Sequence, residues 1–284
     1  MAHDRSCRRH TRQSIPGVSK GSGVTALNGT PKFTALVLAA SRGPNDPVAK
    51  SEGVSHKALV DIHGIPMLQR IVSTLAASTS IDRIGVAIDD PSIIDTLEGS
   101  NLISAPVGKT PGASVLAGAA AIDTPYPLLV TTGDHPLLTP KMIDRFCADA
   151  LATNADVVAG LASAAVILAD QSETKRTFLK FRDGRFSGCN LFAILNSEGL
   201  KAPAFWSQIE HHRKTPWRLV SAFGIAALVL FALRRLTLEQ AFDRAGQRFG
   251  ARAAPVVLPW ANAAIDVDKP TDLNLVRKIL RRDS

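Results

Sequence analysis

The chain has 284 residues, which is enough for one large α/β domain or two small ones. Hydrophobic residues make up 45% and charged residues 20%, and this composition excludes a mostly disordered protein. The formal net charge of +8 indicates an anionic partner: a nucleic acid, an anionic membrane or a phosphorylated small molecule.

The positive charge is distributed unevenly. Residues 33–171 hold 8 basic and 14 acidic residues, whereas residues 172–235 hold 11 basic and 4 acidic ones. Residues 1–32 are basic and rich in Gly and Ser, which predicts a disordered tail. This tail lacks the apolar core of a secretory signal, so we expect no export. The three widely spaced cysteines indicate neither a disulfide framework nor a zinc site, and they favour the cytoplasm.

Strands and helices are predicted to alternate from Phe33 onward. The apolar run FTALVLAA is typical of a strand that is buried on both faces. Further strands are expected at 84–88, 127–134 and 155–162, and helices after Pro66, at 113–122 and after Pro140. This alternation predicts a three-layer α/β sandwich with a mostly parallel sheet.

The rhythm changes after about Ser172. Residues 176–192 are predicted to form a hairpin with Asp183-Gly184 at its turn. The apolar run 219–233 has 15 residues, fewer than the ~20 of a membrane-spanning helix. Because this run is apolar all round, it predicts a buried helix, an interface with a second copy or a peripheral contact with a membrane surface.

The last segment is predicted to return to the α/β pattern. It has short strands at 254–259 and 263–268 and a closing helix from Pro270. We therefore expect one domain over 33–284, with 172–235 as an α+β insertion that binds the acceptor.

Two loops that follow predicted strands carry candidate chemistry. In LVLAASRG, the small residues from Ala39 to Ser41 allow backbone N–H groups to approach a polyanion, and Arg42 adds a cation. In GDHPLL, Asp134 directly follows a buried strand and is suited to Mg²⁺. An ordinary small-residue turn and a turn-forming Asp are the alternatives.

A third feature is AAIDVDKPTDL near the end of the chain. Asp266 and Asp268 have the spacing of a strand and would face the same side, so one of them is a candidate second metal ligand. The alternative is a group of charges at a helix N-terminus, which suits Asp272 better.

In this order, the three features resemble the nucleotidyltransferases of the sugar-phosphate and molybdenum-cofactor type. The stretch HKALVDIHGIPML is similar to the lysine motif of these enzymes and singles out Lys57. GASVLAGAAA is similar to the helix by which cytidylyltransferases hold the nucleoside, with Ser114 at the matching serine. The chain departs from the pattern at Ser41, where glycine is usual, and at Lys269, where Thr is usual.

The resemblance covers about 33–163 and 254–282 and implies a GT-A-like fold. It also implies Mg²⁺-dependent transfer of an NMP unit from an NTP, with CTP or GTP favoured, to a phosphorylated small molecule, releasing pyrophosphate. The residues implied are Arg42 and Lys57 for catalysis, Leu38, Ala39, Ala40, Ser41, Ser114 and Gly133 for the nucleotide, and Asp134 and Asp266 for the metal.

The acceptor is expected over the basic insertion. Lys175, Arg176, Lys180 and Asn190 are the candidates, with a solvated basic face and a turn as the alternatives. Two other functions stay open: a GT-A-type glycosyltransferase using a nucleotide-sugar, and a non-catalytic nucleotide-binding or membrane-associated relative. Nucleic acid is not expected as a partner, because aromatic residues are only 5% and do not alternate with the cations.

Overall fold

The computed structural model describes residues 1, 30–41, 43, 45–99, 102–123, 125–170, 176–209 and 225–282. Residues 2–29 of the predicted tail, Arg42, Lys175 and the first part of the apolar run, 219–224, therefore lie outside the described residues. All of the architecture below belongs to the unit that begins at Pro31.

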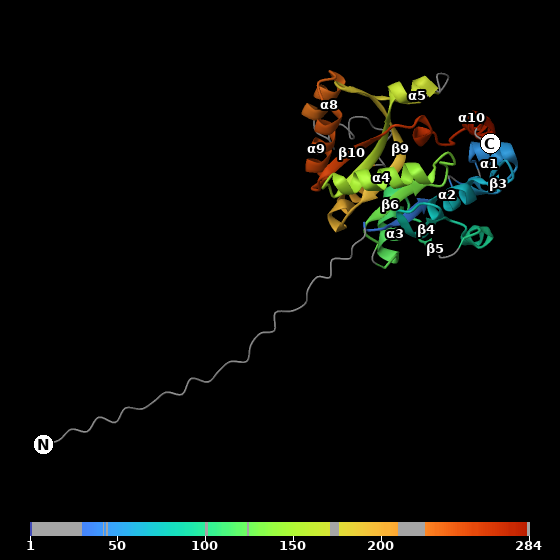
Figure 1. Cartoon of the computed structure of the whole chain (residues 1–284), viewed down its shortest axis with the longest axis horizontal. Coiled ribbons are helices and arrows are strands. Elements are labelled where there is room, and N and C mark those ends of the chain that lie inside the picture. The colour runs from blue at the N-terminus through green and yellow to red at the C-terminus, as the bar shows by residue number, and fades with distance from the viewer. Residues whose placement is uncertain are drawn as a thin grey trace. The chain divides into compact units, whose positions relative to one another are not determined.

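An eight-stranded sheet forms the centre of this unit (Figure 1). Seven strands lie in the order β10-β7-β9-β6-β1-β4-β5, and β8 pairs with β9 at the side. Their bounds are β1 Phe33–Leu38, β4 Ile81–Ala87, β5 Leu102–Ala105, β6 Leu128–Thr132, β7 Val157–Ser163, β8 Leu179–Phe181, β9 Gly184–Ile194 and β10 Ala253–Leu258. Among the described strands of this sheet, only the pairs that include β9 are antiparallel, which confirms the predicted mostly parallel sheet.

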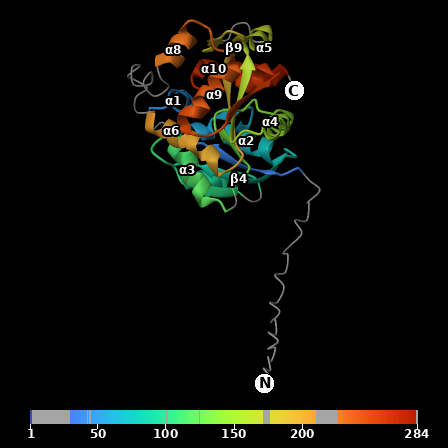
Figure 2. The same ribbon diagram turned by 90° about the vertical axis from the view of Figure 1, so that its left-hand side faces the viewer.

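Helices cover both faces of the sheet, because the strands alternate their buried side chains between two cores. Phe33 and Val37 of β1 point to the core under α2 (Met67–Ala76) and α4 (Pro140–Ala152). Leu36 points to the opposite core under α3 (Pro111–Ala121). Figure 2 shows α2 and α4 on one side and α3 on the other. This arrangement confirms the three-layer prediction.

The segment after residue 175 joins the main sheet rather than standing beside it. Its long strand β9 lies between β6 and β7 and pairs antiparallel with both. β8 and β9 form the predicted hairpin, but Phe181 pairs with Gly184, so Arg182-Asp183 is the turn in place of Asp183-Gly184. The Asp183 carboxylate accepts the N–H of Leu238 instead, at the start of α9 (Leu238–Phe249).

A second, smaller core lies beyond the carboxyl ends of the central strands. It joins α1 (Pro47–Glu52), the small hairpin of β2 (Asp61–Ile62) and β3 (Ile65–Pro66), and α10 (Pro270–Arg282). The strand predicted at 263–268 is wrong. Residues Ala261–Ala264 form a short 3-10 helix, after which the N–H of Val267 donates to the carbonyl of Asp134.

The remaining helices are short. They are α5 (Ala164–Asp170), α6 (Lys201–Ile209), α8 (Ile225–Ala232) and the 3-10 turns Lys57–Leu59, Pro91–Thr96 and Ser197–Leu200. In α8, Phe231 packs on Phe181 of β8 and Val229 is 49% exposed, while Leu233, just after the helix, is 59% exposed. Residues 229–233 of the apolar run are therefore only partly buried. Among the described residues, no helix has both the length and the apolar character to cross a membrane.

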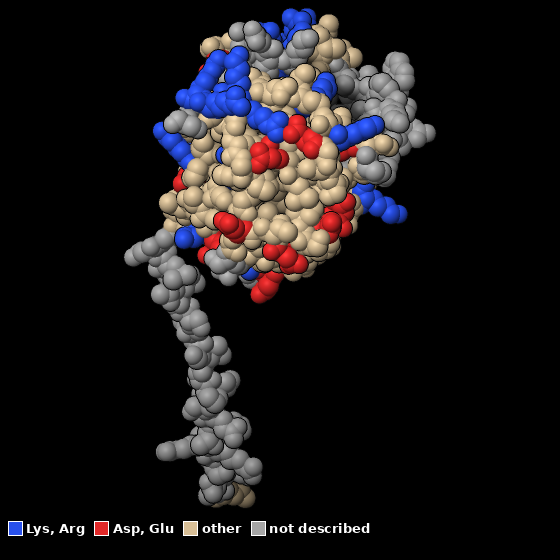
Figure 3. Space-filling model, turned by 90° about the vertical axis from the view of Figure 1, so that its right-hand side faces the viewer, with Lys and Arg blue, Asp and Glu red and all other residues tan. Residues whose placement is uncertain are grey.

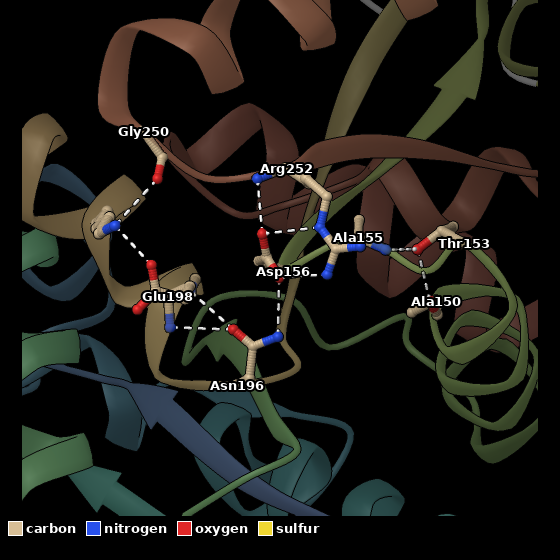
Figure 4. A network of polar contacts seen from close by, with 10 residues as sticks. Ala150, Thr153, Ala155, Asp156, Asn196, Glu198, Gly250 and Arg252 are labelled. Carbon is tan, nitrogen blue, oxygen red and sulfur yellow. Dashed lines mark hydrogen bonds and ion pairs between the residues drawn. The ribbon is translucent and has the colours of Figure 1, made fainter.

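A network of polar contacts joins three segments at the start of β7 (Figure 4). The buried carboxylate of Asp156 accepts the backbone N–H of Arg252 at 2.8 Å and an Nη2–H of its guanidinium at 2.7 Å. It also accepts the side-chain amide of Asn196 at 2.9 Å. The hydrogen bonds from the Arg252 side chain hold the pKa of Asp156 well below its usual range, against the opposing effect of burial.

Candidate active site

Three loops meet where the parallel strands β6, β1 and β4 end, the place at which open α/β sheets bind ligands. The N–H of Gly133, after β6, donates to the carbonyl of Leu38, and the N–H of Ala39 donates to that of Ala87, the last residue of β4. A Cβ at position 133 would lie 2.8 Å from that of Ala39, so this approach requires glycine. The predicted nucleotide residues Leu38 to Ser41 and Gly133 are thus brought together.

Lys57 and Asp134 form the centre of the site. The Lys57 Nζ lies 2.7 Å from Oδ2 of Asp134 and 3.9 Å from Oδ1 of Asp268. The side chains of Lys57 and Asp134 are only 12% and 18% exposed. Burial by itself would raise the pKa of Asp134, but the nearby Lys57 ammonium and smaller contributions from its neighbours together outweigh burial, and the pKa is lowered. Asp134 is therefore ionised at neutral pH.

The second carboxylate oxygen of Asp134 is the candidate ligand for the predicted metal. Its Oδ1 is buried and accepts no hydrogen bond from any residue that the structure describes. A buried carboxylate oxygen without a partner is costly unless a ligand completes it. Mg²⁺ commonly takes only one or two protein carboxylates and leaves its other positions to substrate phosphates and water. The donor set thus suits Mg²⁺, although the described residues contain no cluster of three or more metal-ligating side chains.

Asp266 contacts two side chains of the segment that follows residue 175. Its Oδ1 lies 3.0 Å from Nη1 of Arg176, and its Oδ2 accepts the side-chain amide of Asn190 at 2.8 Å. Asn190 has φ of +49°, a left-handed conformation that Asn tolerates better than most residues, at the irregular pairing of β9 with β7. Two of the predicted acceptor residues, Arg176 and Asn190, therefore adjoin the predicted metal ligand Asp266.

Two other predicted residues lie apart from this cluster. Lys180 is exposed on β8 and pairs with Arg185 beside the hairpin turn, five positions along β9 from Asn190. Ser114 is buried in α3, where its Oγ accepts the N–H of Gly108 at 3.0 Å and donates to the carbonyl of Thr110. Ser114 thus shapes the loop before α3, and its contact with a nucleoside stays a prediction.

His135, the residue after Asp134, is completely buried. Burial lowers its pKa to about 4, although the carboxylates of Asp134 and Asp266 act in the opposite direction. The imidazole is therefore neutral at physiological pH, and it adds no cation to the site.

Sequence reasoning missed two residues at the loop that follows β1. The Asp89 carboxylate accepts the backbone N–H of Ser41 at 2.7 Å, and Nε2 of His56 lies 3.2 Å from the same oxygen. The signal for Asp89 was present in the sequence, since it follows a buried strand just as Asp134 does. His56 precedes Lys57, and its ring accepts the N–H of Ala58.

The family model for the MobA-like NTP transferase domain matches residues 35–213, which is more than half of the chain. The chain belongs to this family. It is thus a member of a nucleotidyltransferase family, as the motifs predicted.

Among curated relatives, it is 38% identical over 94 residues to a 3-deoxy-manno-octulosonate cytidylyltransferase of Neisseria gonorrhoeae, covering 31% of this chain and 37% of that protein. The cytidylyltransferase of the same name from Desulfosudis oleivorans is 31% identical over 122 residues, covering 41% and 48%. The chain thus matches less than half the length of these relatives.

Solved structures share the architecture over most of the chain. A hypothetical transferase from Thermus thermophilus superposes with a TM-score of 0.72 at 28% identity, covering 85% of this chain and 99% of the other. The 4-diphosphocytidyl-2C-methyl-D-erythritol synthase of Anaerococcus prevotii superposes with a TM-score of 0.57 at 15% identity, covering 89% and 99%. A CMP:2-keto-3-deoxy-manno-octonic acid synthetase complexed with CTP also gives 0.57, at 14% identity, covering 90% and 100%. The last two show a shared fold.

Proposed function

We propose that this protein transfers a nucleoside monophosphate unit from an NTP, with CTP favoured, to a phosphorylated small molecule and releases pyrophosphate. The observation that carries the proposal is the Lys57–Asp134 pair, in which the second carboxylate oxygen of Asp134 is buried and accepts no hydrogen bond from a described residue. The choice of CTP rests on the cytidylyltransferases among the relatives.

The chemistry requires an anionic acceptor to approach an anionic donor, so positioning and charge neutralisation dominate. Backbone N–H groups of the loop after β1, with Arg42, would hold the β- and γ-phosphates. The Lys57 ammonium would stabilise the charge that develops on the α-phosphoryl group. Asp134 and Asp266 would hold Mg²⁺, which when bound supplies Lewis-acid neutralisation of phosphate charge. No nucleophilic side chain is required.

Arg176 and Asn190 would receive the acceptor phosphate. Arg176 is partly buried and pairs with Asp266, so its guanidinium is held at the site rather than in solvent. Figure 3 shows most Lys and Arg of this face in its upper part, with some Asp and Glu between them, and mainly Asp and Glu in its lower part. Lys175 and Lys180 would then contribute to attraction of the anion over a longer range.

A screen of the four NTPs against phosphorylated sugars, polyols and cofactor precursors tests this function, with pyrophosphate release in the presence of Mg²⁺ as the readout. We expect turnover with CTP and at least one acceptor, and loss of turnover in Lys57→Ala. Absence of pyrophosphate with every pair would overturn the proposal. Turnover of a nucleotide-sugar that survives Lys57→Ala would instead establish the glycosyltransferase alternative.

A further inference from the structure

We infer that His56 and Asp89 are positioning residues that fix the loop after β1 relative to Lys57, and so set the affinity of the site for the triphosphate. This inference rests on the proposed function, and it names a determinant of that function that the resemblance to nucleotidyltransferases did not supply.

The contacts of Asp89 connect two segments of the site. One oxygen, Oδ1, accepts both the backbone N–H of Ser41 and the Nε2–H of His56, at 2.7 and 3.2 Å. The hydrogen bonds from Ser41 and His56 lower the pKa of Asp89, although burial acts in the opposite direction. Asp89 is therefore ionised at neutral pH and accepts two hydrogen bonds where β4 ends.

His56 carries this connection to the catalytic lysine. Its Nδ1 accepts the N–H of Ala58 at 3.0 Å, so in the neutral ring the proton lies on Nε2, which donates to Asp89. The accepted bond caps the 3-10 turn Lys57–Leu59, and the buried ring leaves little room for another rotamer. One imidazole therefore joins the turn that carries Lys57 to the carboxylate that holds Ser41.

Ser41 is fixed from a second direction as well. Its Oγ accepts the N–H of Gly43 at 2.9 Å, and Gly43 has φ of +88°, which favours glycine. The hydroxyl at this position, where the resembled enzymes have glycine, thus shapes the turn. A loop whose backbone is held before the triphosphate arrives loses less conformational entropy on binding, and this lowers the dissociation constant.

Two conservative substitutions separate the two bonds of the ring. In His56→Asn, the side-chain oxygen can still cap the N–H of Ala58, but the short side chain does not reach Asp89. In His56→Gln, the amide nitrogen lies near the position of Nε2 and can still donate to Asp89. His63→Asn is the matched control, because His63 lies on the β2–β3 turn, bonds the carbonyl of Arg277 and has the left-handed φ that Asn tolerates.

The experiment measures CTP binding with Mg²⁺ by calorimetry, together with kcat and KM for pyrophosphate release and the melting temperature. We expect His56→Asn and Asp89→Ala each to raise the dissociation constant and KM for CTP on the order of 10-fold, with little change in melting temperature. His56→Gln and His63→Asn should remain near wild type. The double variant His56→Asn/Asp89→Ala should bind CTP no more weakly than Asp89→Ala, because both substitutions break one connection.

Wild-type affinity in His56→Asn, or a loss in His56→Gln that exceeds the loss in His56→Asn, would overturn the inference and leave His56 as a cap of its turn. Tighter CTP binding by Asp89→Ala would also overturn it, since Asp89 would then compete with the triphosphate for the N–H of Ser41. If the wild-type protein bound no NTP, the proposed function would fail, and this inference with it.

Discussion

Two buried aspartates at different strands show how the same residue type serves different ends. Asp156, at the start of β7, accepts hydrogen bonds from the backbone and guanidinium of Arg252 and from the amide of Asn196. Asp134, after β6, accepts a bond from Lys57 on one oxygen, and its other oxygen is buried without a partner among the described residues. The described residues therefore supply hydrogen-bond donors to both oxygens of Asp156 but to only one oxygen of Asp134.

The difference separates stability from function. A buried carboxylate that accepts hydrogen bonds on both oxygens contributes to the free energy of unfolding. Its removal leaves the donors that were paired with it without a partner. A carboxylate with a bare buried oxygen stores a cost that a bound cation can relieve. Substitution of Asp134 should therefore change activity more than stability, whereas substitution of Asp156 should do the reverse.

The largest effect is expected for Asp134→Asn. The amide oxygen can still accept from Lys57, but the negative charge for the metal is lost, so pyrophosphate release should fall by about 10²–10³-fold. The free energy of unfolding should change by no more than about 1 kcal/mol. Steady-state kinetics and urea unfolding of the same preparations check both parts. Full activity in this variant would remove Asp134 from the site.

Asp156→Ala is expected to have the opposite profile. Loss of the carboxylate should lower the free energy of unfolding by about 2–4 kcal/mol, since hydrogen bonds to a charged group contribute about 1.5–3 kcal/mol each. The KM for CTP of the folded protein should be unchanged. Asp149→Ala is the matched control, because Asp149 forms only an i,i+4 pair with the half-exposed Arg145. This substitution should lower the free energy of unfolding by less than about 0.5 kcal/mol.

Acid should reduce the contribution of Asp156. Its pKa is lower in the folded state than in the unfolded chain, where an Asp titrates near ~3.9. The stabilisation is therefore complete above that value and is lost as the pH falls below it. The difference in unfolding free energy between wild type and Asp156→Ala, measured in urea at pH 7, 5 and 3, should shrink at pH 3. A difference that grew toward acid pH would contradict the assignment.

The smallest effect concerns Cys147 of α4 and Cys189 of β9, which are both buried in the core under α2 and α4. Burial raises the pKa of each thiol to about 12, so both should be inert to a thiol reagent at pH 8 in a Cys7→Ser background. Labelling should accelerate in Asp156→Ala and stay at the wild-type rate in Asp134→Asn. Equal acceleration in both variants would show that Asp134 also contributes to stability.

The local pattern of the sequence predicted much of this molecule, because buried strands and the loops after them are set by nearby residues. Lys57 and Asp134 were predicted from their motifs, and the structure places them in contact. The position of β9 between β6 and β7 depends on pairing between distant segments, which a local pattern does not report.

The strand wrongly predicted at 263–268 and the missed residues His56 and Asp89 also depend on contacts between distant segments. Residues 263–268 have an alternating pattern, but the backbone there bonds to Asp134 instead of a strand. The sequence pattern also gave no distance from Asp266: Lys180 lies near the hairpin turn, apart from Arg176, and its contact with an acceptor stays a prediction. His56 and Asp89 were missed because their contact joins positions 33 residues apart.

We propose above all that Asp134, whose Oδ1 accepts no hydrogen bond from a described residue, belongs to an NTP site that requires Mg²⁺. Calorimetry of CTP binding, with and without Mg²⁺, to wild type, Asp134→Asn and Asp156→Asn tests it most directly. We expect Mg²⁺-dependent binding to wild type and Asp156→Asn, and little or none to Asp134→Asn. Equal binding by all three variants, or binding by wild type that does not respond to Mg²⁺, would contradict it.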